Sequence, residues 1–287
     1  MRKKLVWAVL LCLVLAAVMP MTALAAGEEI HVSNVEELVA AIADQEDGDT
    51  IILDAGTYDV ADRCTTIEAN INGVASGFVL PIFADNVTLR AAEGAAVTLT
   101  SSFDPNTGNW NQQNFITISG KNVTLENLTL QGNPNGFYDG TCNKVIELID
   151  GAKDVTLKNL DVEPLTDSEG KEFTGSIYVN VADAGDTVIE DVTLGAWINA
   201  RAVTSGTVTA KDVTIDFVNN SYSGAAGFNP AITYNTPGCV SVSGLTVEVD
   251  ANVNFNEQVL NEFLPDGTTV RLNGNVALDK TATIKRN

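Results

Sequence analysis

Three side chains with complementary chemistry precede successive copies of a repeated phrase in this chain. Glu147, Tyr178 and Arg201 each fall on a short strand that we predict immediately before the phrase. Strict alternation along these strands places all three on the outward face, on consecutive levels of a stack. A carboxylate, a phenol and a guanidinium on one face could serve as acid, base and anion clamp. The alternative is that they are ordinary outward residues of an exposed sheet.

A second set of candidates lies on the same outward column and in the variable segments between the copies. Its aromatic rings could stack on sugar faces, and its amides could hydrogen-bond to sugar hydroxyls. The aromatics could equally fold back as small apolar clusters that hold long loops in place. The predicted carbohydrate-binding residues are Trp110, Phe137, Tyr138, Asn180, Trp197, Tyr222 and Asn235.

The element that must position these residues is a nine-residue phrase that occurs five times. The copies begin at Val123, Val155, Thr187, Val208 and Val240, so they start 32, 32, 21 and 32 residues apart. Each copy contains two short strands of alternating apolar and polar residues around an Asn-, Asp- or Gly-containing corner. One such unit buries its apolar face only against a neighbour. The repeat therefore predicts a solenoid.

A third strand is predicted before each phrase, which gives three strands per coil. These strands are expected at residues 115–118, 145–149, 176–180, 200–203 and 231–235. The segments that follow each phrase vary in length and account for the period of 32 residues instead of 21.

Stacking the phrases in register predicts columns that structure alone explains. The corner column holds residue types that tolerate the left-handed conformation, and the column before it alternates in charge. The corner column is Asn127, Asn159, Asp191, Asp212 and Gly244. The charge column is Glu126, Lys158, Glu190, Lys211 and Ser243. The inward columns, which include Leu125, Leu157 and Ile189, are the expected core, so function is expected where the repeat is broken.

The ends of the solenoid carry their own signals. A helix capped by Ser33 or Asn34 and running to about Gln45 is expected to cover the first coil, at residues 47–58. A second short helix at 256–264 and weak strands at 268–284 are expected at the other end. We therefore predict one domain over 27–287, with an N-terminal cap at 27–46 and a C-terminal cap and last strands at 256–287.

Residues 1–26 are predicted to be a secretory signal peptide. A basic start is followed by an apolar stretch at 5–18 and by Ala23-Leu24-Ala25, the small-x-small pattern of a cleavage site. No later apolar run reaches about 18 residues, so no transmembrane segment is expected after cleavage. The expected location is extracellular.

Charge and metal-ligand content exclude several functions. The net charge of −21 disfavours binding to nucleic acids and unassisted binding of polyuronates, because these ligands need basic contacts. With His31 as the only histidine, and with Cys64, Cys142 and Cys239 dispersed after the leader, no metal site is predicted. These three cysteines could form one disulfide or stay as free thiols. No cofactor is expected; Ca²⁺ stays possible through the acidic segment 167–172, whose spacing fits no defined calcium loop.

Three stretches carry a resemblance to a known superfamily. They are Val35-Glu-Glu-Leu-Val-Ala-Ala-Ile42, the run from Gly48 to Tyr58, and the repeated Asn-Val-Thr-Leu-x-Asn-Leu-Thr-Leu phrases. The chain resembles the pectin-lyase-like right-handed parallel β-helix superfamily over nearly its whole predicted mature length. That superfamily includes polysaccharide lyases, glycoside hydrolases, adhesins and proteins without known catalysis, so the resemblance implies architecture and leaves activity open.

The expected fold is an all-β, right-handed, single-stranded parallel β-helix with an N-terminal capping helix. The expected function is that of a secreted carbohydrate-associated or cell-surface protein, a monomer that binds a polysaccharide or other glycan. One alternative is a divergent polysaccharide lyase or glycoside hydrolase that uses Glu147, Tyr178 and Arg201. A polygalacturonase-like mechanism would also need a histidine in the cleft, and His31 lies beside the cap. A structural or adhesive solenoid without catalysis is the second alternative.

Overall fold

The computed structural model describes most of the solenoid. The described residues are 27–60, 69–71, 74–76, 78–100, 114–131, 143–163, 165–166, 172–173, 175–195, 197–216, 232–249, 268–272 and 275–279. The predicted signal peptide and the predicted C-terminal helix at 256–264 lie outside these residues and stay predictions. Within the described part, no helix is long and apolar enough to cross a membrane.

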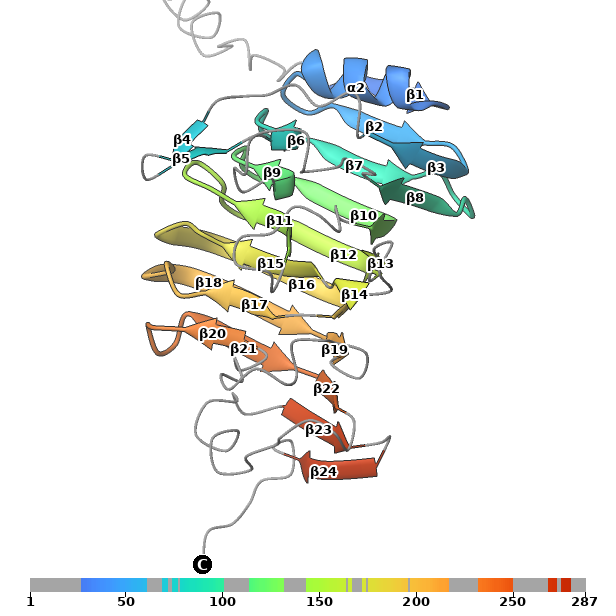
Figure 1. Cartoon of the computed structure of the whole chain (residues 1–287). Coiled ribbons are helices and arrows are strands. Elements are labelled where there is room, and N and C mark those ends of the chain that lie inside the picture. The colour runs from blue at the N-terminus through green and yellow to red at the C-terminus, as the bar shows by residue number, and fades with distance from the viewer. Residues whose placement is uncertain are drawn as a thin grey trace, which may run out of the picture.

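The molecule is an elongated stack of strands with one helix at its N-terminal end. Helix α2 (Val35–Ala43) lies on β1 (Glu29–Val32) and β2 (Thr50–Leu53), while β23 (Thr268–Leu272) and β24 (Asn275–Asp279) lie at the opposite end (Figure 1). Most neighbouring strands pair in parallel, and the last pair, β23 with β24, is antiparallel. The predicted parallel β-helix with an N-terminal capping helix is confirmed.

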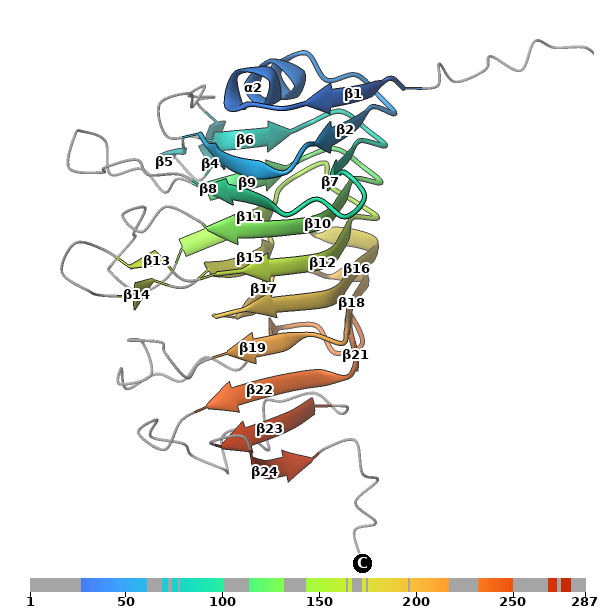
Figure 2. The same cartoon turned by 90° about the vertical axis from the view of Figure 1, so that its right-hand side faces the viewer.

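The coils build two main sheets. The fourteen-stranded sheet runs in the order β1-β2-β7-β10-β12-β16-β19-β22-β23-β24, with β3, β8, β18 and β21 beside this path, and the six-stranded sheet runs β20-β17-β15-β11-β9-β6 (Figures 1 and 2). The remaining strands of the large sheet are β3 (Gly56–Asp59), β7 (Thr88–Ala91), β8 (Val97–Thr100), β10 (Thr124–Gln131), β12 (Thr156–Val162), β16 (Asp183–Leu194), β18 (Ser205–Lys211), β19 (Thr214–Asp216), β21 (Val240–Ser243) and β22 (Leu245–Val249).

The six-stranded sheet is built from the five strands that precede the phrases and from β6, which precedes β7. They are β6 (Phe78–Ile82), β9 (Asn114–Ile118), β11 (Asn143–Leu148), β15 (Gly175–Val179), β17 (Ile198–Ala200) and β20 (Ile232–Tyr234). Two small antiparallel hairpins, β4 (Ala69–Ile71) with β5 (Val74–Ser76) and β13 (Leu165–Thr166) with β14 (Glu172–Phe173), lie outside both sheets.

The corner of the phrase bends the large sheet. Asn127, Asn159, Asp191, Asp212 and Gly244 all have positive φ, between 48° and 82°. Asn159 Nδ2 donates to Asn127 Oδ1 at 2.7 Å, so the amides also join neighbouring coils. The predicted left-handed conformation of the corner is confirmed. The two halves of the phrase form one continuous strand in β10, β12 and β16 and separate strands in β18 with β19 and β21 with β22, so the number of strands differs between coils.

The inward and charge columns stack in the predicted register. Leu125, Leu157 and Ile189 lie on consecutive levels, and none of them is exposed to solvent. Glu126 pairs with Lys158, Lys158 with Glu190, and Glu190 with Lys211 in the sheet. Lys211 also forms an ion pair with Glu190. These columns specify register and core packing.

The capping helix is fixed at both ends. Asn34 is the N-cap, and its Oδ1 accepts from the Glu37 backbone N–H at 2.9 Å. At the other end, the buried Gln45 amide donates to the Pro81 carbonyl at 2.9 Å and accepts from the Phe83 N–H at 3.0 Å. The helix therefore closes the first coil through a satisfied buried amide as well as through apolar contact.

Cys239 is a buried free thiol, whereas Cys64 and Cys142 lie outside the described residues.

Candidate functional site

The outward column of the six-stranded sheet differs from the predicted one at one level. The register aligns Thr117, Glu147, Tyr178, Asn199 and Thr233 on consecutive levels. The prediction that Arg201 follows Tyr178 in this column is wrong. Strand β17 begins at Ile198, earlier than expected, because Ile198 and Ala200 fill the inward positions and are fully buried. Arg201 instead lies in the turn after β17.

Much of this outward column is not exposed. Glu147 is only 1 % exposed, and Thr117 and Thr233 are also buried. The expectation of an open carboxylate at Glu147 is therefore wrong. Alternation along a strand determines which face a side chain takes, but it does not determine whether other parts of the chain cover that face. Tyr178 and Asn199 are half-buried, so the column is accessible mainly at these two levels.

A β-bulge in β11 brings a lysine to the same face as Glu147. The register pairs Lys144 with Ser176 and Glu147 with Tyr178. Between these two pairs β11 therefore advances by three residues and β15 by only two, which is a β-bulge in β11. Residues three apart on a regular strand point to opposite faces, and the extra residue at the bulge reverses this. Both Val145 and Ile146 are buried as a result.

Gly175 makes room for this bulge. A Cβ at Gly175 would lie 2.2 Å from Val145 Cγ2 and 2.5 Å from Val162 Cγ1. The sequence contains the bulge residue and the glycine, but neither forms a recognisable local motif. Lys144 was consequently missing from the predicted site.

Lys144 and Glu147 form the polar centre of the site. Lys144 Nζ lies 2.9 Å from Glu147 Oε1, and the glutamate side chain is 2 % exposed against 23 % for the lysine. Asn180 Nδ2 donates to the same oxygen at 3.3 Å. The Lys144 ammonium also lies over the Tyr178 ring, 4.8 Å from its centroid. The lysine thus neutralises the buried carboxylate and contacts the aromatic ring at the same time.

A shallow depression of about 350 Å³ opens over these residues. It brings together side chains from β11, β15 and β17 and from the turns that follow β15 and β17. Its lining is Lys144, Tyr178, Val179, Asn180, Asn199, Arg201 and Ala202. The structure therefore places Tyr178, Asn180 and Arg201 together, as the sequence predicted. Lys144 and Asn199 are additional members.

The turn that carries Arg201 is held on both sides by asparagines. The Arg201 backbone N–H donates to Asn199 Oδ1 at 3.1 Å, and Asn235 Nδ2 donates to the Arg201 carbonyl at 3.1 Å. Asn235, one of the predicted binding residues, thus supports the turn, and its side chain is not part of the lining of the depression.

Of the aromatic residues predicted to bind carbohydrate, only Trp197 lies among the described residues. Trp197 is 6 % exposed, so it is a packing residue and the prediction that it stacks on a sugar is wrong. The other aromatic candidates, Trp110, Phe137, Tyr138 and Tyr222, lie outside the described residues, and their role stays a prediction.

The chemistry of the depression is dominated by hydrogen-bond donors. The ammonium of Lys144, the guanidinium of Arg201 and the amides of Asn180 and Asn199 line it. Such a surface can bind hydroxyl and carboxylate oxygens. Glu147 is unsuited to proton abstraction from a polymer here, because its buried side chain already accepts from Lys144 and Asn180.

Metal ligands do not gather in the described part of the chain, where no three His, Cys, Asp or Glu side chains lie close enough together to hold an ion. Of the acidic segment 167–172, residues 167–171 lie outside the described residues, and Glu172 begins β14. The possibility of Ca²⁺ there stays a prediction.

Comparison with solved structures identifies the fold. A rhamnogalacturonan lyase superimposes with a TM-score of 0.50 at 14 % sequence identity, covering 74 % of this chain and 62 % of the lyase. The chain has the pectin-lyase-like parallel β-helix fold. Two structures of a pectin methylesterase in complex with a hexasaccharide give TM-scores of 0.49 and 0.46 at 13 % and 14 % identity, each with 75 % of this chain and 62 % of the other covered.

This β-helix spans less than two thirds of the length of each of these structures. No protein-family model and no protein of curated function matches its sequence. At such low identity the likeness concerns the fold alone.

Proposed function

We propose that this protein is a secreted carbohydrate-binding β-helix, and that the depression over Lys144, Tyr178 and Arg201 is its glycan-binding site. The observation that carries the proposal is the shared lining of the depression by two cationic side chains, two amides and a half-buried tyrosine. Pockets that bind small polar ligands orient them with a few convergent polar groups of this kind. The predicted signal peptide at residues 1–26 supports an extracellular role.

The charges favour a glycan that carries acidic sugars. The net charge of −21 repels polyanions in general, so an anionic glycan needs a local cationic surface. Arg201 is exposed, and its guanidinium can form two parallel hydrogen bonds to one carboxylate. Lys144 contributes less, because Glu147 already neutralises it.

Binding is favoured over catalysis by the state of Glu147, the one carboxylate that the described residues place beside the depression. Glu147 is buried and paired, whereas proton transfer requires a group within reach of the substrate. The structural neighbour of this fold acts on rhamnogalacturonan, but a shared fold does not transfer an activity.

The proposal is tested by titrating the full-length protein with a panel of neutral and acidic polysaccharides and measuring binding by calorimetry. Arg201→Ala and Asn180→Ala are each expected to weaken binding of the best ligand by about tenfold, since hydrogen bonds to charged groups contribute most. Arg90→Ala is the matched control, because Arg90 lies on β7 in the other sheet.

Two outcomes would contradict this assignment. One is the absence of binding across the panel, and the other is binding that both substitutions leave unchanged. Assays for unsaturated products and for new reducing ends, with and without Ca²⁺, should remain negative; turnover that is lost in Glu147→Gln would favour the lyase or hydrolase alternative instead.

A further inference from the structure

Arg201 lies between two asparagines on neighbouring levels of the six-stranded sheet. Strands β15, β17 and β20 pair side by side, and the first residues after them are Asn180, Arg201 and Asn235 in turn. The Asn180 amide nitrogen donates to Glu147 Oε1 on the level before it, at 3.3 Å. The Asn235 amide nitrogen donates in the same direction to the Arg201 carbonyl, at 3.1 Å. This position therefore carries a donor amide on either side of the arginine.

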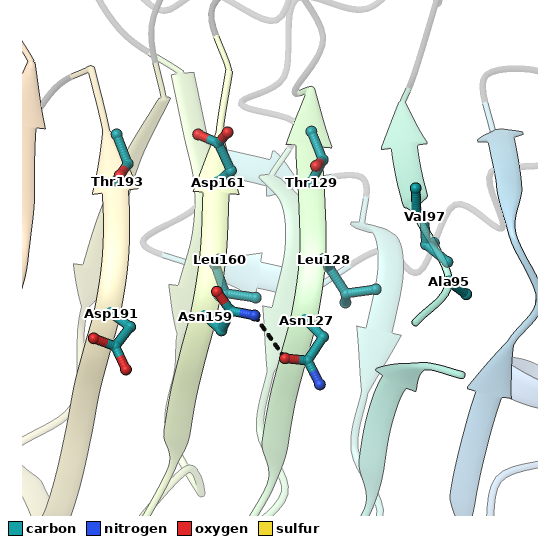
Figure 3. Close-up of a pocket in the computed structure, with 11 residues that line it drawn as sticks. Ala95, Val97, Asn127, Leu128, Thr129, Asn159, Leu160, Asp161, Asp191 and Thr193 are labelled. Atoms are coloured by element: carbon teal, nitrogen blue, oxygen red, sulfur yellow. Dashed lines mark hydrogen bonds between the residues drawn. The ribbon is translucent and has the colours of Figure 1, made fainter. Parts of the chain in front are cut away.

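Asn199 and Asn235 bond differently from the asparagines at the corner of the large sheet. At the corner, Asn159 donates to the side-chain oxygen of Asn127 on the neighbouring strand (Figure 3). In the turn at Arg201, both asparagine side chains bond to the backbone instead, and Asn199 Oδ1 accepts from the Arg201 N–H at 3.1 Å. The two bonds act on the peptide units before and after Arg201. Because each peptide unit is planar, they restrain both backbone dihedral angles of Arg201 and the direction of its Cα–Cβ bond.

The rest of the turn is anchored without Asn235. The Val203 side chain is fully buried in the core. The Thr204 N–H then donates to the Ala182 carbonyl at 2.8 Å, which ties the end of the turn to the level before it. Loss of the Asn235 bond should therefore free the peptide at Arg201 and leave the turn and the coil in place.

The guanidinium that this turn presents carries the uncompensated charge of the depression. Arg201 is exposed and lines the depression, and among the described residues it has no ion-pair partner. Lys144, the other cation of the lining, is paired with Glu147. Discrimination between acidic and neutral ligands therefore depends mainly on Arg201 and on where the backbone places it.

We propose that Asn235 is a positioning residue of the glycan site, which holds Arg201 where its guanidinium can bond to a carboxylate and so gives the site its preference for acidic sugars. This inference rests on the proposed function. Asn235 is outside the lining of the depression, so it acts only through the turn. A turn that is already ordered loses less conformational entropy when the ligand binds. Asn199 completes the clamp through its oxygen, which leaves its amide nitrogen to donate to the ligand.

Calorimetric titration of the full-length protein with an oligogalacturonate, whose rings carry carboxylates, tests the proposal. The methyl-ester form of the same oligomer is the matched probe without charge. Asn235→Ala should weaken binding of the oligogalacturonate by about fivefold, because the arginine must then be ordered at the moment of binding. Binding of the ester should change by less than about twofold, since an ester offers the guanidinium no charge. A general loss of stability would not change the ratio of the two affinities.

A double-mutant cycle separates positioning from other effects of the substitution. In the Arg201→Ala background, Asn235→Ala should cost no further affinity, since the side chain that it positions is absent. Gln131→Ala is the matched control, because it removes another amide bond between neighbouring levels, from Gln131 Nε2 to Glu163 Oε2 at the end of β10. It should leave both affinities within about twofold of the original values. Asn235 is exposed, so urea denaturation of Asn235→Ala should still show one cooperative transition.

Three results would overturn the positioning role: unchanged affinity of Asn235→Ala for the oligogalacturonate, an equal loss for both probes, or a further loss in the Arg201→Ala background. The proposed function survives each of them as long as Arg201→Ala alone weakens binding. If the original protein does not bind the oligogalacturonate, or if Arg201→Ala binds it as tightly as the original protein does, the preference for acidic sugars fails and the positioning role fails with it.

Discussion

Lys144 Nζ lies 2.9 Å from Glu147 Oε1, and the two side chains share a face only because β11 contains a bulge between them. The pair is asymmetric. The carboxylate is 2 % exposed, whereas the lysine side chain is 23 % exposed and reaches the depression. A buried charge that loses its partner is strongly destabilising, whereas a charge that can turn into water is not.

The two halves of this ion pair should therefore respond differently to substitution. Lys144→Met removes the ion-pair partner of Glu147 Oε1 from a buried carboxylate and should lower the free energy of unfolding by about 3 kcal/mol. Glu147→Gln keeps an acceptor for Asn180 and lets Lys144 turn outward, so it should cost about 1 kcal/mol. Urea denaturation of both variants measures the difference. A larger loss for Glu147→Gln would show that the lysine, and not the carboxylate, is the confined charge.

Gly175→Ala tests the space that the bulge needs. Because the new Cβ would lie 2.2 Å from Val145 Cγ2, we expect a loss of about 2 kcal/mol through overpacking. Val145→Ala should cost less in the Gly175→Ala background than in the original protein, since it removes one of the two clashing side chains. A double-mutant cycle from urea denaturation gives this coupling. Strictly additive effects would mean that Val145 moves aside freely.

The corner column could be predicted from the sequence, whereas the bulge in β11 could not. The corner column could be predicted because the same residue types recur at one position of a repeat, and positive φ at Asn127, Asn159 and Asp191 follows from stacking. The Lys144–Glu147 pair could not, because residues three apart on a regular strand face opposite sides. The relevant signal was Gly175, which lies on the neighbouring strand and acts through space.

Burial limited the prediction in a second way. Glu147 and Trp197 were chosen for residue type and position, and both are covered in the folded chain. A periodic pattern distinguishes the two faces of a strand, but it does not give the solvent exposure of either face. Tyr178, Asn180 and Arg201 were brought together as expected, although Arg201 reached the depression from a turn instead of the predicted strand.

Substitutions at Asn159 should separate the two roles of the corner column. Asn159→Gly keeps a residue suited to φ of 48° and loses only the bond to Asn127, so we expect a cost of about 1 kcal/mol. Asn159→Ala loses the same bond and adds the strain of a left-handed Cβ, a further 1 kcal/mol or so. Urea denaturation of the pair measures the strain directly. Equal stability of the two variants would indicate that the corner relaxes to negative φ.

Asp161 should make the stability of the protein depend on pH. Burial and Glu163 raise its pKa above the ordinary value of 3.8, so the folded chain binds this proton more tightly than the unfolded chain does. The stability that this group contributes is therefore greatest at pH values below the ordinary aspartate pKa of the unfolded chain. It is lost as the pH rises through the pKa of Asp161 in the folded chain. Asp161→Asn removes the ionisation. It should be more stable than the original protein at about pH 7, and this advantage should disappear near pH 3.

Urea denaturation across this pH range measures the effect, with Asp150→Asn, on an exposed turn, as the control for loss of one negative charge. The control should lack the pH-dependent gain in stability. An advantage of Asp161→Asn that is the same at both pH values would contradict a raised pKa.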